Sequence, residues 1–292
     1  MNFKPLINKL GLGLISFGKK QFQIADAELA ERRGIRLTNL LWYLDKKHRK
    51  QTLSNLAVAF PEKTKAERYK MARANYRHFG CLAADFIRSP MLSDTEVAMP
   101  EEGSKHLTKL LEAKKGVLMI TAHLGNWERL GAWAPTHGVR ASGVARDAND
   151  DELTVEIKKI RANRGLNILS SGNAAREILT NLKAGEIIII LPDQNNDDVY
   201  IPFFGRIAGT AIGPARVHLK TKAPILPMCI LRSGPGEFRV IFREPLVAHE
   251  GENAEALMTR VNQEIEAMIR LAPEQYLWMH DRWRNARKAG LF

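Results

Sequence analysis

The stretch GVLMITAHLGNWERLGAW (residues 116–133) contains the pattern that decides the fold. Its apolar run is typical of a buried strand and stops at His123, and Glu128 follows five positions later. On one continuous helix, residues five apart point about 140° away from each other and cannot meet. If the strand ends near residue 122 and a helix begins near residue 126, Glu128 projects from the first helical turn, where the helix dipole favours a carboxylate. We therefore expect a strand, a turn that contains His123, and a helix.

The chain after residue 116 continues this alternation of short apolar runs and helical stretches. The apolar runs are GVLMITA, ASGVA, IIIIL and ILPMCIL, and the helical stretches include AAREILTNLKA and NAEALMTRVNQEIEAMIRL. Buried strands separated by helices indicate βαβ units and a parallel sheet. The predicted fold class is α/β, with a mostly parallel central sheet flanked by helices.

The residues before this region have a helical pattern. Ala, Lys, Arg and Leu dominate there, and apolar residues recur at helical spacing. Thr64 followed by Glu67 predicts a capping box at the start of one helix. We expect residues 1–90 to form an N-terminal helical, membrane-associating region and residues 91–292 an α/β domain, the two making one continuous structural unit.

Positive charge is concentrated at the N-terminal end. Residues 1–80 contain 17 Lys or Arg and 6 Asp or Glu, so they carry a net charge of +11 out of +12 for the whole chain. Such a surface suits an anionic membrane, an acidic carrier protein or nucleic acid, or it is simply a solvated face. The sequence has no RNA- or DNA-binding signature, which disfavours nucleic acid as a partner.

The first residues favour the membrane among these partners. Residues 3–22 are apolar but interrupted by Asn8 and Lys9, and they fall short of the ~18–20 apolar residues that a spanning helix needs. A helix with leucines and a phenylalanine along one side and lysines near both ends suits a segment that lies in the membrane interface. The alternative is a helix packed on the protein's own core. We expect peripheral or monotopic attachment.

Several enzyme classes are disfavoured because their motifs are missing. The sequence has no GxSxG, no GxxxxGK[ST], no HExxH and no GxGxxG after a strand. The two cysteines, Cys81 and Cys229, have no metal-ligand spacing around them, so neither a zinc site nor a disulfide framework is expected. We expect no metal ion and no cofactor.

His123 and Glu128 together suggest acid–base chemistry. The glutamate can accept a hydrogen bond from one imidazole nitrogen and leave the other nitrogen free as a base. Such a base can deprotonate a hydroxyl group that the substrate supplies, which typically contributes a factor of ~10²–10⁴ in rate. The alternative is a hydrogen-bonded structural histidine at a strand end.

Six short blocks carry a family resemblance. They are NLAVAFPE (55–62), HLGNWE (123–128), RANRG (161–165), LPDQN (191–195), FFG (203–205) followed by Thr210, and PEQYLWMHDRW (273–283). In this order they resemble the bacterial lipid A late acyltransferases, the lauroyl/myristoyl transferase family, within the HxxxxD/E glycerolipid acyltransferase superfamily. The resemblance covers the chain from about residue 50 to residue 285.

The resemblance implies a membrane-associated O-acyltransferase at the cytoplasmic face of the bacterial inner membrane. It would move a fatty acyl chain from acyl carrier protein or acyl-CoA to a hydroxyl group of a glycolipid, first of all a lipid A precursor. Phosphatidylinositol mannosides and lysophospholipids are alternative acceptors. An acyl thioesterase and a non-catalytic lipid-binding membrane protein are the remaining alternatives.

The resemblance also implies roles for individual residues. His123 would be the general base and Glu128 its orienting partner. The expected substrate-binding residues are Asn126, Arg146, Arg161, Arg164, Asp193 and Gln194. The arginines suit phosphate groups of the lipid or of the donor's phosphopantetheine, or they form ordinary surface ion pairs. Backbone N–H groups at the start of the following helix, or an arginine, would stabilise the oxyanion.

Overall fold

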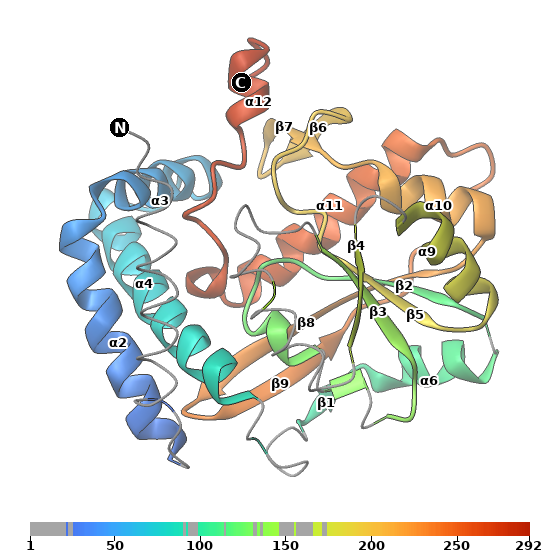
Figure 1. The fold of residues 1–292 in the computed structure, drawn as a ribbon. Helices are drawn as coiled ribbons and strands as arrows, with labels where there is room; N and C mark the ends of the chain where they lie inside the picture. Colours follow the sequence, from blue (N-terminus) through green and yellow to red (C-terminus); the bar gives the residue numbers. More distant parts are fainter. Residues whose placement is uncertain are drawn as a thin grey trace.

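The computed structural model describes residues 22, 26–89, 92, 99–113, 115–130, 133–134, 137–145, 155, 166–170 and 174–292. Its first helices, α2 (Ala27–Leu44), α3 (Lys46–Ala59) and α4 (Lys65–Arg88), form a layer beside an α/β body (Figure 1). The predicted capping box is present at the start of α4: Thr64 Oγ1 accepts from the Glu67 N–H at 3.2 Å, and Glu67 Oε2 accepts from the Thr64 N–H at 2.7 Å.

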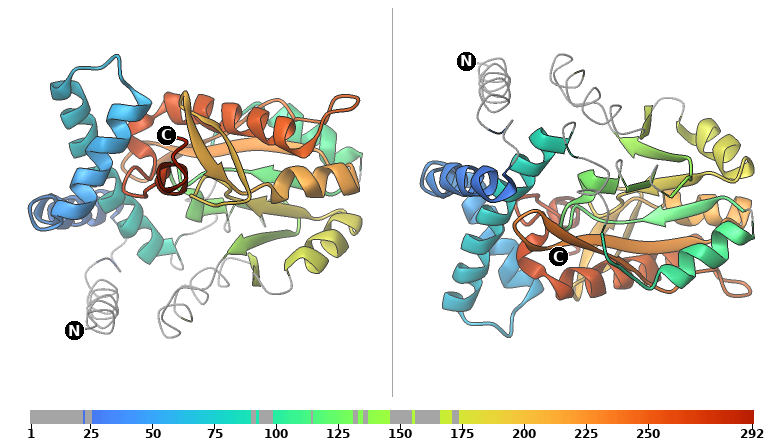
Figure 2. Two further views of the ribbon diagram at one scale, coloured as in Figure 1. Left: turned by 90° about the horizontal axis from the view of Figure 1, so that it is seen from above. Right: turned by 90° about the horizontal axis from the view of Figure 1, so that it is seen from below.

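The helical layer is held together by a close approach of α2 and α4. Gly34 of α2 faces Gly80 of α4, and a Cβ atom added at Gly34 would lie 2.1 Å from the Gly80 carbonyl oxygen. Only glycine permits this backbone contact. Both views of Figure 2 show α2, α3 and α4 together at one side of the body.

The body is built on a seven-stranded sheet in the order β1-β9-β8-β2-β5-β3-β4. The strands are β1 (Glu101–Glu102), β2 (Val117–Ile120), β3 (Ala141–Ala145), β4 (Asn167–Ser170), β5 (Ile187–Ile190), β8 (Ile225–Gly234) and β9 (Glu237–Phe242). Neighbouring strands pair in parallel except β8 and β9, which are antiparallel. The predicted mostly parallel α/β sheet is confirmed. A separate hairpin, β6 (Val199–Phe203) with β7 (Arg206–Thr210), lies outside this sheet.

Helices cover both faces of the sheet, which explains the continuous apolar runs of its strands. Along β5, Ile188 belongs to one core cluster, whereas Ile187 and Ile189 belong to the other. The first cluster includes side chains of α9 (Ala174–Lys183), α10 (Gly213–Thr221) and α11 (Ala254–Leu271), and the second includes α6 (Ser104–Glu112). The sheet is therefore a buried layer on which the site can be built rigidly.

The C-terminal segment joins the helical layer to the body. It contains the 3₁₀ helix η3 (Pro273–Gln275) and the short helix α12 (Arg284–Lys288), and Figure 1 shows it passing between the two parts. Asn55 Nδ2 donates to the carbonyl oxygens of Trp278 (2.8 Å) and His280 (2.7 Å). Asn75 Nδ2 likewise donates to the carbonyl oxygen of Tyr276 at 2.7 Å. Two of the blocks noted in the sequence, 55–62 and 273–283, are therefore in direct contact.

The predicted membrane segment, residues 3–22, lies outside the described residues apart from Phe22. Among the residues that the structure describes, no helix combines the length and the apolar character needed to cross a membrane. The division at residue 90 and the membrane association of residues 1–90 stay predictions.

Candidate active site

His123 and Asp193 meet because two neighbouring parallel strands end at the same edge of the sheet. His123 follows β2, Asp193 follows β5, and the two strands pair in register from Val117 and Ile187. The His123 Nδ1 atom lies 2.9 Å from Asp193 Oδ1, and the His123 backbone N–H donates to Asp193 Oδ2 at 3.0 Å. The carboxylate therefore fixes both the imidazole and the backbone that bears it.

Asp193 is buried and ionised. Burial alone would raise the pKa of its carboxyl group, but the charge of His123, two hydrogen bonds from His123 and the charge of Arg282 together lower the pKa below its ordinary value. An ionised carboxylate holds a proton on Nδ1, so in the neutral form of the ring the lone pair lies on the second nitrogen, Nε2. The geometry thus provides an imidazole that can act as a base at Nε2.

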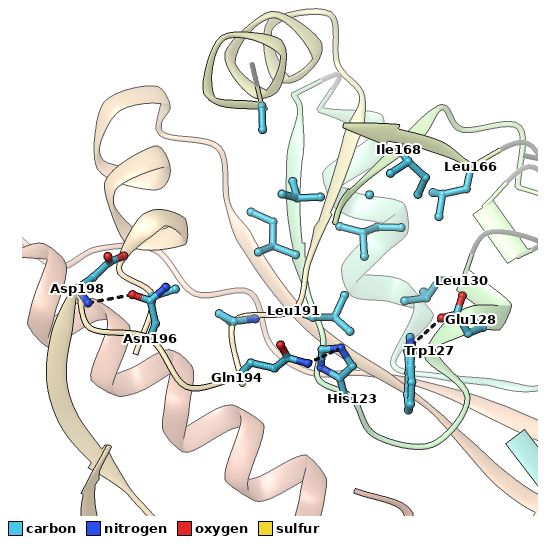
Figure 3. Close-up of a pocket in the computed structure, with 17 residues that line it drawn as sticks. His123, Trp127, Glu128, Leu130, Leu166, Ile168, Leu191, Gln194, Asn196 and Asp198 are labelled. Atoms are coloured by element: carbon cyan, nitrogen blue, oxygen red, sulfur yellow. Dashed lines mark hydrogen bonds between the residues drawn. The ribbon is translucent and has the colours of Figure 1, made fainter. Parts of the chain in front are cut away.

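Gln194 faces that nitrogen. Its side-chain Nε2 atom lies 3.3 Å from His123 Nε2, and Figure 3 shows the two side chains pointing at each other across the floor of a pocket. In the neutral form of the ring this Nε2 atom carries a lone pair, to which the amide N–H can donate. The sequence predicted Gln194 only as a substrate-binding residue.

Glu128 reaches His123 through a third side chain. Its Oε1 atom accepts from Trp127 Nε1 at 3.0 Å, and the Trp127 ring packs against the His123 ring with centroids 5.1 Å apart. We expected Glu128 to hold one imidazole nitrogen, and the carboxylate found at His123 Nδ1 is that of Asp193. The pairing of β2 with β5 brings Asp193 alongside His123, whereas Glu128 lies in the 3₁₀ turn η2 (Trp127–Arg129). Glu128 and His123 still line the same pocket (Figure 3).

The turn between His123 and η2 is braced from α4. Asp85 accepts from Asn126 Nδ2 at 2.7 Å and from Arg129 Nε at 2.9 Å, and all three side chains are buried. The Asn126 side chain, predicted to contact substrate, is therefore directed toward Asp85 inside the protein. His78, also on α4, places its Nε2 atom 3.1 Å from the Gly125 carbonyl oxygen.

The close packing of this turn requires glycine at position 125. Gly125 has φ of +62°, and a Cβ atom there would lie 1.8 Å from the Ile230 carbonyl oxygen. Its N–H donates to the carbonyl oxygen of Gln275 at 3.1 Å. The turn is therefore seated on β8 and on the C-terminal segment.

The backbone N–H groups of the turn are already engaged. Those of residues 123–126 donate to Asp193, Ala122, Gln275 and Ile230, in that order. These four N–H groups therefore have partners within the protein. That backbone N–H groups at the start of the following helix, or an arginine, stabilise the oxyanion stays a prediction.

A pocket of about 680 Å³ opens beside His123. His123, Trp127, Glu128 and Gln194 lie together at one side of it, the polar end. Asn196 and Asp198 lie beyond Gln194, and an apolar arm includes residues of β3, β4 and β5 (Figure 3). The arm is lined by Leu130, Gly143, Val144, Leu166, Ile168, Ala174, Ile189, Ile190 and Leu191. At Gly143 an added Cβ atom would lie 3.4 Å from Leu166 Cδ2 and 3.5 Å from Ile168 Cδ1, so this glycine leaves room where a side chain would protrude.

The C-terminal segment supports the far side of the site. His280 Nε2 accepts from the backbone N–H of Asn195 at 2.9 Å, and burial lowers the pKa of His280 to about 4, so its ring is neutral. Arg282 is buried and donates from Nη2 to Thr210 Oγ1 at 2.7 Å. Arg282 lies in the WMHDRW block, but nothing in the sequence indicated this role.

The other predicted site residues are placed as follows. Arg146, Arg161 and Arg164 lie outside the described residues.

In the part of the chain that is described, no group of three or more His, Cys, Asp or Glu side chains could hold a metal ion. Cys81 and Cys229 are buried free cysteines.

Comparison with known proteins gives a consistent result. The family model described as bacterial lipid A biosynthesis acyltransferase matches residues 16–285. The lipid A biosynthesis lauroyltransferase of Escherichia coli strain K12 is 26% identical over 265 residues, which is 87% of this chain and 85% of that protein. The lipid A biosynthesis palmitoleoyltransferase of the same strain is 24% identical over 243 residues, 79% of this chain and 77% of that protein. The phosphatidylinositol mannoside acyltransferase of Mycobacterium tuberculosis strain H37Rv is 23% identical over 164 residues, 53% of this chain and 52% of that protein.

Proposed function

The chain belongs to the bacterial lipid A biosynthesis acyltransferase family, and from this premise we propose that it transfers a fatty acyl chain from a thioester donor to a hydroxyl group of a lipid A precursor. The observation that carries the proposal is the His123–Asp193 pair, which lies at the polar end of a pocket with a long apolar arm. An oriented base beside an apolar channel is what acyl transfer to an alcohol requires.

The proposed reaction uses His123 Nε2 as the general base. The acceptor O–H gives its proton to Nε2 while its oxygen forms a bond to the thioester carbonyl carbon, and the carbonyl π electrons move to the oxygen. When this tetrahedral intermediate collapses, the C–S bond breaks, and the leaving sulfur takes the proton from Nε2. The products are an ester and a thiol, and no metal or cofactor is needed. Asp193 stabilises the transient imidazolium through Nδ1.

Glu128 is the second carboxylate of the proposed catalytic group. It holds Trp127 through the indole N–H, and Trp127 in turn packs against the imidazole. A fixed indole limits how far the base can rotate, which keeps Nε2 directed at the acceptor. In the HxxxxE motif of this chain, the glutamate would therefore act on the histidine through Trp127, the residue that precedes it.

The apolar arm is the proposed site of the fatty acyl chain. Its strand residues come from the buried sheet, so its walls are rigid, and each buried CH₂ group gains about 0.8 kcal/mol. A chain of ten or so carbons therefore binds mainly by burial, while the thioester remains at the polar end beside His123.

Membrane association of the N-terminal region is proposed from α2 as well as from the sequence. Five leucines of α2 are between 37% and 68% exposed: Leu29, Leu37, Leu40, Leu41 and Leu44. They lie on one side of the helix, next to the side that packs on α4, and the exposed lysines Lys46, Lys47 and Lys50 follow at the start of α3. Apolar side chains bordered by basic ones suit an anionic lipid surface. We propose peripheral attachment at the cytoplasmic face of the inner membrane, where acyl carrier protein or acyl-CoA supplies the chain.

A lipid A precursor is preferred as acceptor over a phosphatidylinositol mannoside. The relatives named for lipid A align with 79–87% of this chain, whereas the relative named for phosphatidylinositol mannoside aligns with 53%. The mannoside remains the second candidate because these relatives share the same family.

The test is a reconstituted transfer assay. Purified protein is incubated with acyl-carrier-protein thioester and a lipid A precursor in one reaction, and with a phosphatidylinositol mannoside in another. We expect a mass increase of one acyl chain on the lipid A precursor, and we expect His123→Ala to reduce the rate by at least about 10³-fold. Transfer to the mannoside alone would reassign the acceptor, and a His123→Ala variant with the wild-type rate would refute the mechanism.

A further inference from the structure

The base nitrogen of His123 already has a partner in the structure. Gln194 Nε2 lies 3.3 Å from His123 Nε2, and the lone pair there is available because Asp193 holds the proton-bearing Nδ1 at 2.9 Å. The amide oxygen of Gln194 would repel this lone pair, so the amide nitrogen is the chemically consistent neighbour. The Gln194 N–H therefore donates to the atom that must later receive the acceptor's proton.

The acceptor hydroxyl and Gln194 compete for this lone pair. An imidazole nitrogen has one lone pair in the plane of the ring, and it accepts one well-aligned hydrogen bond. When the acceptor donates its O–H to Nε2, the Gln194 amide must turn away. A polar N–H group left unpaired in a partly buried pocket costs about 1–3 kcal/mol, so a new acceptor nearby would stabilise the displaced position.

Such an acceptor appears during the reaction itself. The attacking oxygen is about 3 Å from Nε2, and the carbonyl carbon is about 3–3.5 Å from that oxygen before attack. The carbonyl oxygen, which becomes negatively charged, therefore lies within a few ångströms of the position that Gln194 leaves. The N–H groups of residues 123–126 cannot serve it, because all four donate within the protein, and Trp127 Nε1 donates to Glu128.

We propose that Gln194 is a catalytic residue with two successive partners. Its Nε2–H group first donates to His123 and then, displaced by the acceptor hydroxyl, donates to the oxyanion of the tetrahedral intermediate. When the C–S bond breaks and the carbonyl forms again, the amide returns to His123. This inference rests on the proposed function, because acyl transfer is what creates the oxyanion.

The experiment compares two substitutions of Gln194 with a matched control. Gln194→Glu keeps the size of the side chain and removes its N–H donor, and Gln194→Ala removes the whole group. Gln263→Glu makes the same chemical change on the exposed side of α11. Initial rates are measured with acyl-carrier-protein thioester and lipid A precursor, so that kcat and KM are obtained separately.

We expect kcat to fall by about 10²–10³-fold in both Gln194 variants, with KM for each substrate changed by less than about threefold. Gln194→Glu should be no better than Gln194→Ala, because its carboxylate brings negative charge to the oxyanion. The Gln263→Glu control should keep the wild-type kcat. Thermal unfolding of each variant checks that the fold is retained. Gln194→Glu keeps the size of the side chain, so a loss of kcat in this variant is not caused by lost packing.

Two results would overturn the inference while the proposed function stands. If Gln194→Glu kept kcat within about threefold of wild type while Gln194→Ala lost activity, the N–H donor would not be needed, and Gln194 would only fill space beside the imidazole. If KM rose and kcat did not change, Gln194 would only bind substrate. Failure of the proposed function has a different signature, because the wild-type protein itself would then give no transfer.

Discussion

The two ends of the pocket are constructed in different ways. At the polar end, hydrogen bonds from distant parts of the chain hold His123 (by Asp193), the turn after β2 (by Asp85 and His78) and the backbone of Asn195 (by His280). The apolar arm, by contrast, is formed by packing of strand side chains around Gly143. Substitutions at the polar end should therefore change the rate, whereas substitutions in the arm should change which acyl chain is used.

Asp193→Asn tests the polar end most strongly. The amide keeps the size of the carboxylate but cannot offset the charge of an imidazolium, and it can hold the wrong tautomer. We expect kcat to fall by about 10³–10⁴-fold. Steady-state kinetics with both substrates saturating measure this, and circular dichroism checks that the fold is intact. A loss smaller than tenfold would mean that Asp193 only supports the backbone of His123.

Glu128 should have a smaller effect because it acts on His123 through Trp127. In Glu128→Ala the indole N–H loses its acceptor, and we expect kcat to fall by about 10²-fold. Glu128→Gln retains an oxygen that can accept from the indole and should recover part of this loss. Steady-state kinetics give kcat for the alanine and glutamine variants. Equal kcat values would show that the negative charge of Glu128 matters and its contact with the indole does not.

Gly143→Leu tests whether the apolar arm holds the acyl chain. The new side chain would enter the space between Leu166 and Ile168, so long acyl chains should lose about tenfold or more in kcat/KM relative to short ones. A series of acyl-carrier-protein thioesters of increasing chain length measures the change. Gly213, where an added Cβ atom meets nothing within 4 Å, offers Gly213→Ala as a control with unchanged preference. A uniform loss for all chain lengths would contradict the assignment of the arm.

Acidification should weaken the polar end through two histidines, His78, which is buried, and His280, which is partly buried. Burial lowers the pKa of His78 and of His280 from the ordinary 6.5 to about 4. Between these values the unfolded chain binds protons that the folded chain does not, so stability is present above pH 6.5 and is lost as the pH falls toward 4. Each such histidine contributes on the order of 1 kcal/mol per pH unit in this window.

Urea unfolding at pH 7 and pH 5 tests this prediction. His280→Gln should lose less stability on acidification than the wild type, by about 1 kcal/mol. His249→Gln, at an exposed position, is the control and should lose as much as the wild type. If His280→Gln and the wild type showed the same difference between the two pH values, the neutral state of His280 would be refuted.

Local sequence patterns were sufficient to predict a mostly parallel sheet and four of its strands, β2, β3, β5 and β8, including those that precede His123 and Asp193. A short, continuous apolar run indicates a strand that is buried on both faces of a sheet, and a polar residue after the run marks where the strand ends. The pairing of His123 with Asp193 could not be predicted in the same way. It depends on which strands are neighbours, and that is decided by packing between segments about 70 residues apart.

The same limit applies to the turn that follows His123. The expected helix begins there as a 3₁₀ turn at residues 127–129, and residues 130, 133 and 134 are α-helical. Asp85 on α4 draws Asn126 and Arg129 into the interior, and this contact fixes the turn. Nothing within the motif itself indicates a partner some 40 residues earlier.

The contact of Asn55 with the carbonyl oxygens of Trp278 and His280 has a consequence for how the chain matures. The two segments are separated by about 225 residues, so this contact closes a loop that contains every strand of the sheet. Residues 273–283 leave the ribosome after all of those strands, and contacts between such distant segments form late in folding. His280 then reaches Asn195, and the loop that bears Asp193 acquires its last support. We therefore expect the sheet to form during synthesis before the C-terminal segment docks and supports the loop that bears Asp193.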